Sequence, residues 1–188
     1  WKECRDRFPN GIKEVTDYIH KKGMVPGVWL ELEVMGINCE KAKKAPDDWF
    51  FVRHGKRVYD RSRYQLDFRN PAVIEHVNEV IDRVVKEYGV GYIKMDYNIE
   101  PGIGTEIGAE SVGQGLLEHE KAYLNWLDSV FARYPDLVIE NCSSGGLRMD
   151  YALLSRYSIQ SASDQEDYRN FATIAANSPA GVTPEQAA

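Results

Sequence analysis

Apolar and polar positions along this chain alternate between helical and strand-like spacing. Apolar residues at intervals of three and four predict a first helix capped by Asn10, and a continuous apolar run follows it as a strand. The same order then returns several times. Strands that alternate with helices are typical of a parallel sheet, so the pattern predicts the α/β class. The helices are expected near 12–22, 71–88, 115–133, 149–156 and 168–176, and the strands near 24–30, 92–98, 137–142 and 157–162.

Two segments, 41–62 and 99–113, lack either spacing and are predicted to be long loops rich in Gly, Pro and charge. The second directly follows the strand expected at 92–98. Long loops after the strands of an α/β protein lie at the carboxyl edge of its sheet, where ligands bind. A functional site is therefore expected at this edge.

Polar and apolar residues alternate strictly within 92–98. Alternate side chains of a strand leave opposite faces, so Lys94, Asp96 and Asn98 would share one face. Burying a cation and a carboxylate is costly unless they satisfy each other or a ligand. The segment predicts either a site with chemistry or a structural ion pair.

The composition fits one globular domain over residues 1–188, with 43% hydrophobic and 28% charged residues. A net charge of −6 argues against nucleic acid, and no apolar run reaches the length that spans a membrane. The three cysteines lack the spacing of a disulfide framework or a zinc site, which favours a reducing, cytoplasmic compartment. The four histidines share no ligand-like spacing, so all four are expected at the surface.

Several predicted strands end in polar or aromatic residues, and acids from different strands can converge at one rim. Glycoside hydrolysis needs two carboxyl groups, one to attack or to activate water and one to protonate the leaving oxygen. Asp96 and Asp164 are the natural pair, although Asp164 is also suited to cap the helix that follows it. Glu31 and Glu140 are expected to face inward, where each would touch substrate or pair with Lys94.

Three motifs, taken together in their order and spacing, resemble the bacterial α-galactosidase family of retaining glycoside hydrolases, with its melibiase-like catalytic barrel. Similar segments at 7–11, 20–24, 27–33, 47–49 and 66–71 extend the resemblance over nearly the whole chain. The three motifs are Lys94-Met95-Asp96-Tyr97-Asn98, Cys142-Ser143-Ser144-Gly145-Gly146-Leu147-Arg148-Met149-Asp150 and Ser163-Asp164-Gln165-Glu166-Asp167.

The resemblance implies a (β/α)8 TIM barrel, incomplete in this chain and running roughly from the end of its second strand to its seventh. Asp96 would be the nucleophile after the fourth strand, and Asp164 the acid/base after the sixth. In that family, the paired aspartates that bind the galactose hydroxyls belong to the first strand, which is expected upstream of Trp1. The residues expected to bind the sugar are Lys94, Asn98, Trp49, Arg61, Cys142, Gly145, Trp29 and Glu31, with Arg63 as the rival of Arg61.

The implied activity is hydrolysis of terminal α-linked galactose from oligosaccharides by double displacement, without cofactor or metal, in a homo-oligomer that is often a tetramer in relatives. A preference for N-acetylgalactosamine, or transfer to another sugar, stays open. One alternative is a divalent-metal-dependent lyase or isomerase with Asp96, Glu140 and Asp164 as ligands. Another is a non-catalytic sugar-binding barrel piece. Such barrels typically need about 250 residues, so the chain is expected to be part of a longer protein and inactive alone.

Overall fold

The computed structural model describes residues 1–187, which form two compact units. The first unit contains Trp1–Leu30, Val77–Asp96 and the described residues from Arg133 onward. The second contains Glu31–His76 and Tyr97–Ala132. None of the described helices combines the length and the apolar character needed to cross a membrane.

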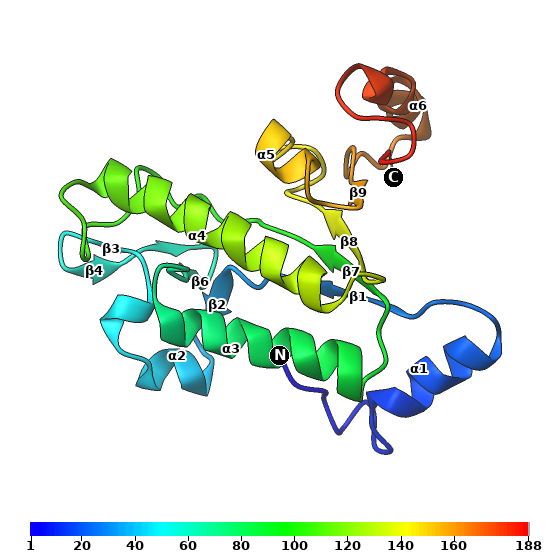
Figure 1. The fold of residues 1–188 in the computed structure, drawn as a ribbon, viewed down its shortest axis with the longest axis horizontal. Coiled ribbons are helices and arrows are strands. Elements are labelled where there is room, and N and C mark those ends of the chain that lie inside the picture. Colours follow the sequence, from blue (N-terminus) through cyan, green and yellow to red (C-terminus); the bar gives the residue numbers. More distant parts are fainter. Residues whose placement is uncertain (188) are drawn as a thin grey trace. The chain divides into compact units, whose positions relative to one another are not determined.

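The first unit is built on a four-stranded parallel sheet, which confirms the predicted α/β class (Figure 1). Its strands lie in the order β1 (Gly27–Leu30), β7 (Tyr92–Met95), β8 (Val138–Asn141) and β9 (Ile159–Gln160). Ile93 and Ile139 are fully buried on one face of neighbouring strands, as the alternation predicts.

The alternation within 92–98 holds only as far as the strand does. Met95 is the last residue of β7, and the N–H of Asp96 extends the pairing by donating to the carbonyl of Leu30 at 2.8 Å. Asn98 lies in the loop beyond, so the prediction that it shares a strand face with Lys94 is wrong. Sequence spacing alone does not show where sheet pairing stops.

Short helices accompany this sheet, and the cap of the first differs from the prediction. α1 (Ile12–Lys21) begins after Gly11, and the carboxylate of Glu3 accepts the Ile12 N–H at 2.7 Å, so the predicted cap at Asn10 is wrong. α5 (Tyr151–Leu154) precedes β9, and α6 (Tyr168–Asn177) continues into a 3₁₀ turn at Ser178–Ala180. Asp167 caps α6 by accepting the Arg169 N–H, so Asp164 is not the capping residue.

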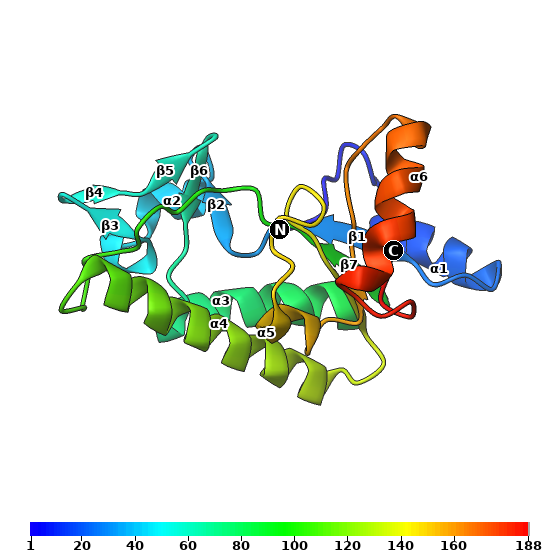
Figure 2. The same cartoon turned by 90° about the horizontal axis from the view of Figure 1, so that it is seen from above.

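The second unit contains antiparallel strands where the segment 41–62 was expected to be a loop (Figure 2). These strands are two or three residues long, too short for a period to be seen, and they are held by the buried Phe50, Phe51 and Val58. The elements are β2 (Val34–Gly36), α2 (Glu40–Lys44), a 3₁₀ turn at Asp47–Trp49, β3 (Val52–Arg53), β4 (Lys56–Arg57), β5 (Tyr59–Asp60) and β6 (Arg63–Gln65).

Two long helices lie close to their predicted ranges. α3 (Pro71–Asp82) starts at the expected Asn70 cap, whose Oδ1 accepts the Ala72 N–H at 2.9 Å, and a π-helical turn, Arg83–Glu87, prolongs it. α4 (Val112–Arg133) begins three residues before its predicted start. The loop expected at 99–113 lies between β7 and α4.

Candidate active site

Polar side chains of the first unit meet near the carboxyl ends of its parallel strands. Trp29 on β1, Lys94 on β7 and Glu140 on β8 are register partners, so they form one row across three strands. Asp96 follows β7 directly and is only 7% exposed. A carboxylate this buried needs partners, and the row of side chains beside it supplies them.

Lys94 is tied to a buried carboxylate. Its Nζ donates to Glu140 Oε1 at 2.9 Å and to Ser161 Oγ at 3.4 Å, and the Tyr92 hydroxyl donates to Glu140 as well. Of the two alternatives for Glu140, contact with substrate or pairing with Lys94, the structure shows the pairing with Lys94.

The charge of Lys94 follows from these contacts. Partial burial works to lower the pKa of Lys94, but the hydrogen bond to Glu140 and the negative charges nearby outweigh it, so the pKa lies above its ordinary value. Burial and the same carboxylate raise the pKa of the Tyr92 hydroxyl. Lys94 is thus held as a cation and Tyr92 as a neutral donor.

Asp96 accepts a hydrogen bond from an aromatic ring. The indole Nε1 of Trp29 donates to Asp96 Oδ2 at 2.9 Å. Trp29 is 46% exposed, and its ring lies edge to face with that of Trp1 at a centroid distance of 6.4 Å. Trp29 was expected to contact the sugar, and the structure adds this direct contact with the predicted nucleophile.

The Gly-containing loop after β8 packs directly against the backbone of Asp164. Gly145 has a φ of 85° and forms a bridge with Ser163. A Cβ at Gly145 would lie 2.5 Å from the Ser163 Cα and 2.9 Å from the Asp164 nitrogen, so only glycine permits this approach. Asp164 itself is exposed.

Cys142 begins this loop and is buried as a free thiol. Its backbone N–H donates to the Met95 carbonyl at 3.0 Å, which joins the end of β8 to the end of β7. Burial raises the pKa of the Cys142 thiol above its ordinary value, although the Gly145 N–H bond to its sulfur opposes this. The thiol is therefore neutral at physiological pH.

Glu31 and Asn98 come together in the second unit. Glu31 is buried and accepts hydrogen bonds from Arg63 Nη1 and from Asn98 Nδ2, the latter at 2.9 Å. Arg63, the rival of Arg61 for the substrate, is thus engaged with a buried carboxylate. Arg61 is exposed and forms, with Ser62, the two-residue turn between β5 and β6 in which both have positive φ.

Trp49 is half-buried at the end of its 3₁₀ turn. Its ring lies 5.8 Å from that of His76, and the Lys41 ammonium lies 5.3 Å from its centroid. The residues expected to bind sugar are therefore divided between the units. The first holds Trp29, Lys94, Asp96, Cys142, Gly145 and Asp164, and the second holds Glu31, Trp49, Arg61 and Asn98.

His119 is a buried polar residue of the second unit, contrary to the expected surface position. It is 1% exposed, its Nδ1 accepts the Phe68 N–H at 3.0 Å, and its Nε2 lies 3.8 Å from a carboxylate oxygen of Glu33. The spacing of four from Gly115 through His119 to Tyr123 places all three on the buried face of α4. That spacing was the signal in the sequence.

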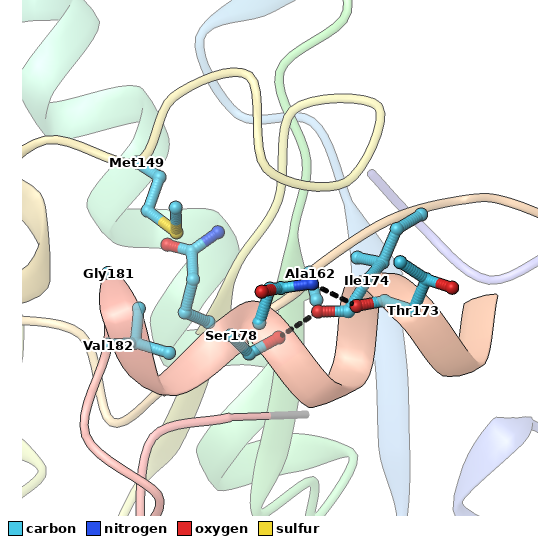
Figure 3. A pocket seen from close by; sticks show the side chains of 9 residues that line it. Met149, Ala162, Thr173, Ile174, Ser178, Gly181 and Val182 are labelled. Atoms are coloured by element: carbon cyan, nitrogen blue, oxygen red, sulfur yellow. Dashed lines mark hydrogen bonds between the residues drawn. The ribbon is translucent and has the colours of Figure 1, made fainter. Parts of the chain in front are cut away.

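A cavity of about 320 Å³ opens in the first unit beside α6 (Figure 3). Apolar side chains such as Met149, Ile174 and Val182 line much of it, and none of the predicted site residues does. Among the described residues, no group of three or more His, Cys, Asp or Glu side chains is arranged to hold a metal ion.

Comparison with known proteins identifies relatives along the whole chain. A sequence model of the Melibiase family matches residues 1–184. The α-galactosidase Mel36A of Lactobacillus acidophilus is 29% identical over 152 residues, which are 80% of this chain and 21% of that protein. This chain therefore spans about a fifth of that relative's length.

Solved structures support the same fold. The crystal structure of the α-galactosidase AgaA from Geobacillus stearothermophilus superimposes with a TM-score of 0.88 at 24% identity, covering 100% of this chain and 26% of that one. A variant of AgaA in complex with raffinose gives a TM-score of 0.87 at 23% identity, with the same coverage of both chains.

Proposed function

This chain belongs to the melibiase family, and from that membership we propose that the protein containing it is a retaining α-galactosidase acting on terminal α-linked galactose. The observation that carries the proposal is the buried Asp96 at the carboxyl end of a parallel sheet, directly after the strand that holds the cation Lys94. A nearby cation favours the ionised carboxylate, the form in which Asp96 can act as a nucleophile.

We further propose that the parallel sheet is part of a (β/α)8 barrel and that residues 1–188 belong to one catalytic domain. In that arrangement β1, β7, β8 and β9 would be its third to sixth strands, and Asp96 and Asp164 would follow the fourth and the sixth. Pairing of Gln160 with Ala187 supports a further strand beside β9. Such barrels carry their active sites on the loops after the strands.

In the proposed mechanism Asp164 protonates the glycosidic oxygen while Asp96 attacks the anomeric carbon. The aglycone leaves, and Asp96 is then esterified by the galactosyl group. Water, deprotonated by Asp164, attacks the same carbon and releases galactose with retained configuration. This sequence requires the two carboxyl groups to lie about 5–5.5 Å apart in the complete site.

The remaining predicted residues would bind the sugar. Lys94, with Glu140 and Ser161 fixing its ammonium group, is suited to donate to a sugar hydroxyl. The raffinose complex of AgaA supports α-galactoside oligosaccharides as substrates. The metal-dependent alternative is weakened, because Glu140, one of its three ligands, is bound to Lys94 and Tyr92.

The test is chemical rescue in the intact protein with an aryl α-galactoside. Asp96→Ala should lose about 10⁴-fold or more in kcat, and added azide should restore turnover with β-galactosyl azide as product. Asp164→Ala with azide should instead give the α-azide, because the nucleophile is still present. Asp17→Ala, which removes an exposed carboxyl group on α1, is the matched control and should keep full activity. An Asp96→Ala protein as active as its parent would remove the assignment.

A further inference from the structure

Trp29 holds the predicted nucleophile by a contact that sugar binding does not require. Its ring nitrogen donates to Asp96 Oδ2 at 2.9 Å, from β1, which pairs with the strand that Asp96 directly follows. The backbone reinforces this arrangement, because the Asp96 N–H donates to the Leu30 carbonyl beside Trp29. Asp96 is therefore fixed to β1 through both its backbone and its side chain.

The charged groups around Asp96 are engaged with other partners, whereas the neutral indole N–H of Trp29 contacts Asp96 directly. Lys94 lies on β7 two residues before Asp96, and the negative charge of Asp96 helps to raise the pKa of the buried Cys142 thiol, which directly follows β8. The negative charges of Glu140 and Asp164 both raise the pKa of Lys94. The Lys94 ammonium donates hydrogen bonds to Glu140 and Ser161, so its charge is partly neutralised by Glu140. The indole N–H is directed at one oxygen of Asp96 alone.

We propose that Trp29 is a positioning residue that orients the Asp96 carboxylate and assists its departure from the covalent intermediate. This inference rests on the proposed function. A carboxylate held at one oxygen by a rigid ring cannot rotate freely about its Cβ–Cγ bond. When water attacks the galactosyl ester, the bond between the anomeric carbon and Asp96 breaks and both its electrons return to the carboxylate. The indole N–H stabilises that developing charge.

Two kinetic consequences separate this role from packing or sugar stacking. Without the N–H, the second step slows more than the first, so the covalent intermediate accumulates and kcat and KM fall together. The ionised form of Asp96 also loses a hydrogen bond. The acid limb of kcat/KM should then move to higher pH by up to about one unit, since a bond to a charged group contributes on that scale.

The experiment compares Trp29→Phe with its parent, as the intact protein, on an aryl α-galactoside with a good leaving group. We expect a lower kcat and KM, a pre-steady-state burst of the aryl alcohol, and an acid limb shifted upward. Replacing Trp29 by the isostere 3-benzothienylalanine keeps the ring's shape and removes only the N–H. It should reproduce these changes even if Trp29→Phe folds poorly. Trp1→Phe, which alters the ring beside Trp29, should leave the acid limb and the burst unchanged.

The outcomes distinguish this inference from the function on which it rests. A parent without α-galactosidase turnover would refute both. If the parent is active and azide rescues Asp96→Ala, but the isostere shows an unchanged acid limb and no burst, only the role of Trp29 is refuted. A rise in KM with kcat unchanged would also refute it, because that is the signature of lost sugar contact.

Discussion

Glu140 is a buried acid that pairs with a neighbouring cation, Lys94. It is 6% exposed and takes hydrogen bonds from Lys94 and Tyr92, so its cost of burial is offset by two donors. From sequence it was one of two inward-facing acids with two possible partners. The register that brings it opposite Lys94 is a property of the sheet and not of either segment alone.

Glu140→Gln tests whether Lys94 depends on this partner. The amide keeps an acceptor for the ammonium but loses the charge, so Lys94 is held less firmly in the position from which we propose it binds the sugar. We expect KM for an aryl α-galactoside to rise about tenfold, with a smaller change in kcat, because Asp96 and Asp164 are untouched. Glu87→Gln, at an exposed position of the same unit, should change neither constant. An unaltered KM in Glu140→Gln would show that Lys94 is positioned by other contacts.

Asp67 carries a pH-dependent part of the stability. Burial works to raise the pKa of Asp67, but contacts with His119 and Arg69 outweigh it and leave the pKa below its ordinary value. A lowered pKa in the folded state contributes stability above the unfolded pKa of about 4, and this is lost as pH falls through the lowered value.

Asp67→Asn should therefore lower the urea midpoint at pH 7, by an amount equivalent to about 1–3 kcal/mol, and reduce the difference between pH 7 and pH 3. Asp17→Asn is the control, because the pKa of Asp17 is also lowered but about half of its side chain on α1 is exposed to solvent. Its acid sensitivity should match that of the parent. Equal acid sensitivity in Asp67→Asn would contradict the prediction.

At the scale of elements, the helices and strands that could be predicted from sequence are those long enough to show several repeats of their spacing. The helices α3 and α4 and the strands β7 and β8 each carry enough repeats for their spacing to be recognised. The antiparallel strands of the second unit were missed because two or three residues show no period, and they exist through pairing with distant segments. The backbone contact of Gly145 with Ser163 is equally invisible in sequence, since a Gly pair also fits an ordinary turn.

Gly145→Ala tests the element that supports Asp164. The new Cβ would meet the backbone at Ser163 and Asp164, and the residue would keep an unfavourable positive φ. Displacement of Asp164 should lower kcat about a hundredfold. Gly113→Ala is the control, because that glycine lies in α4 with open space around its Cα and should be neutral or slightly stabilising. Full activity in Gly145→Ala would mean that this loop does not position Asp164, the proposed acid/base residue.

At the scale of the whole molecule, the proposed catalytic acids can be compared with the number of strands that the proposed barrel needs. The described residues contain both predicted acids and a four-stranded parallel sheet, whereas closing a (β/α)8 barrel takes eight strands. We therefore expect the 188-residue chain, expressed by itself, to give no measurable turnover of an aryl α-galactoside, the substrate class proposed for the intact protein. Calorimetry of the same sample checks its folding. Cooperative unfolding together with full turnover would mean that these residues build a complete sugar site, and the barrel assignment would then fail.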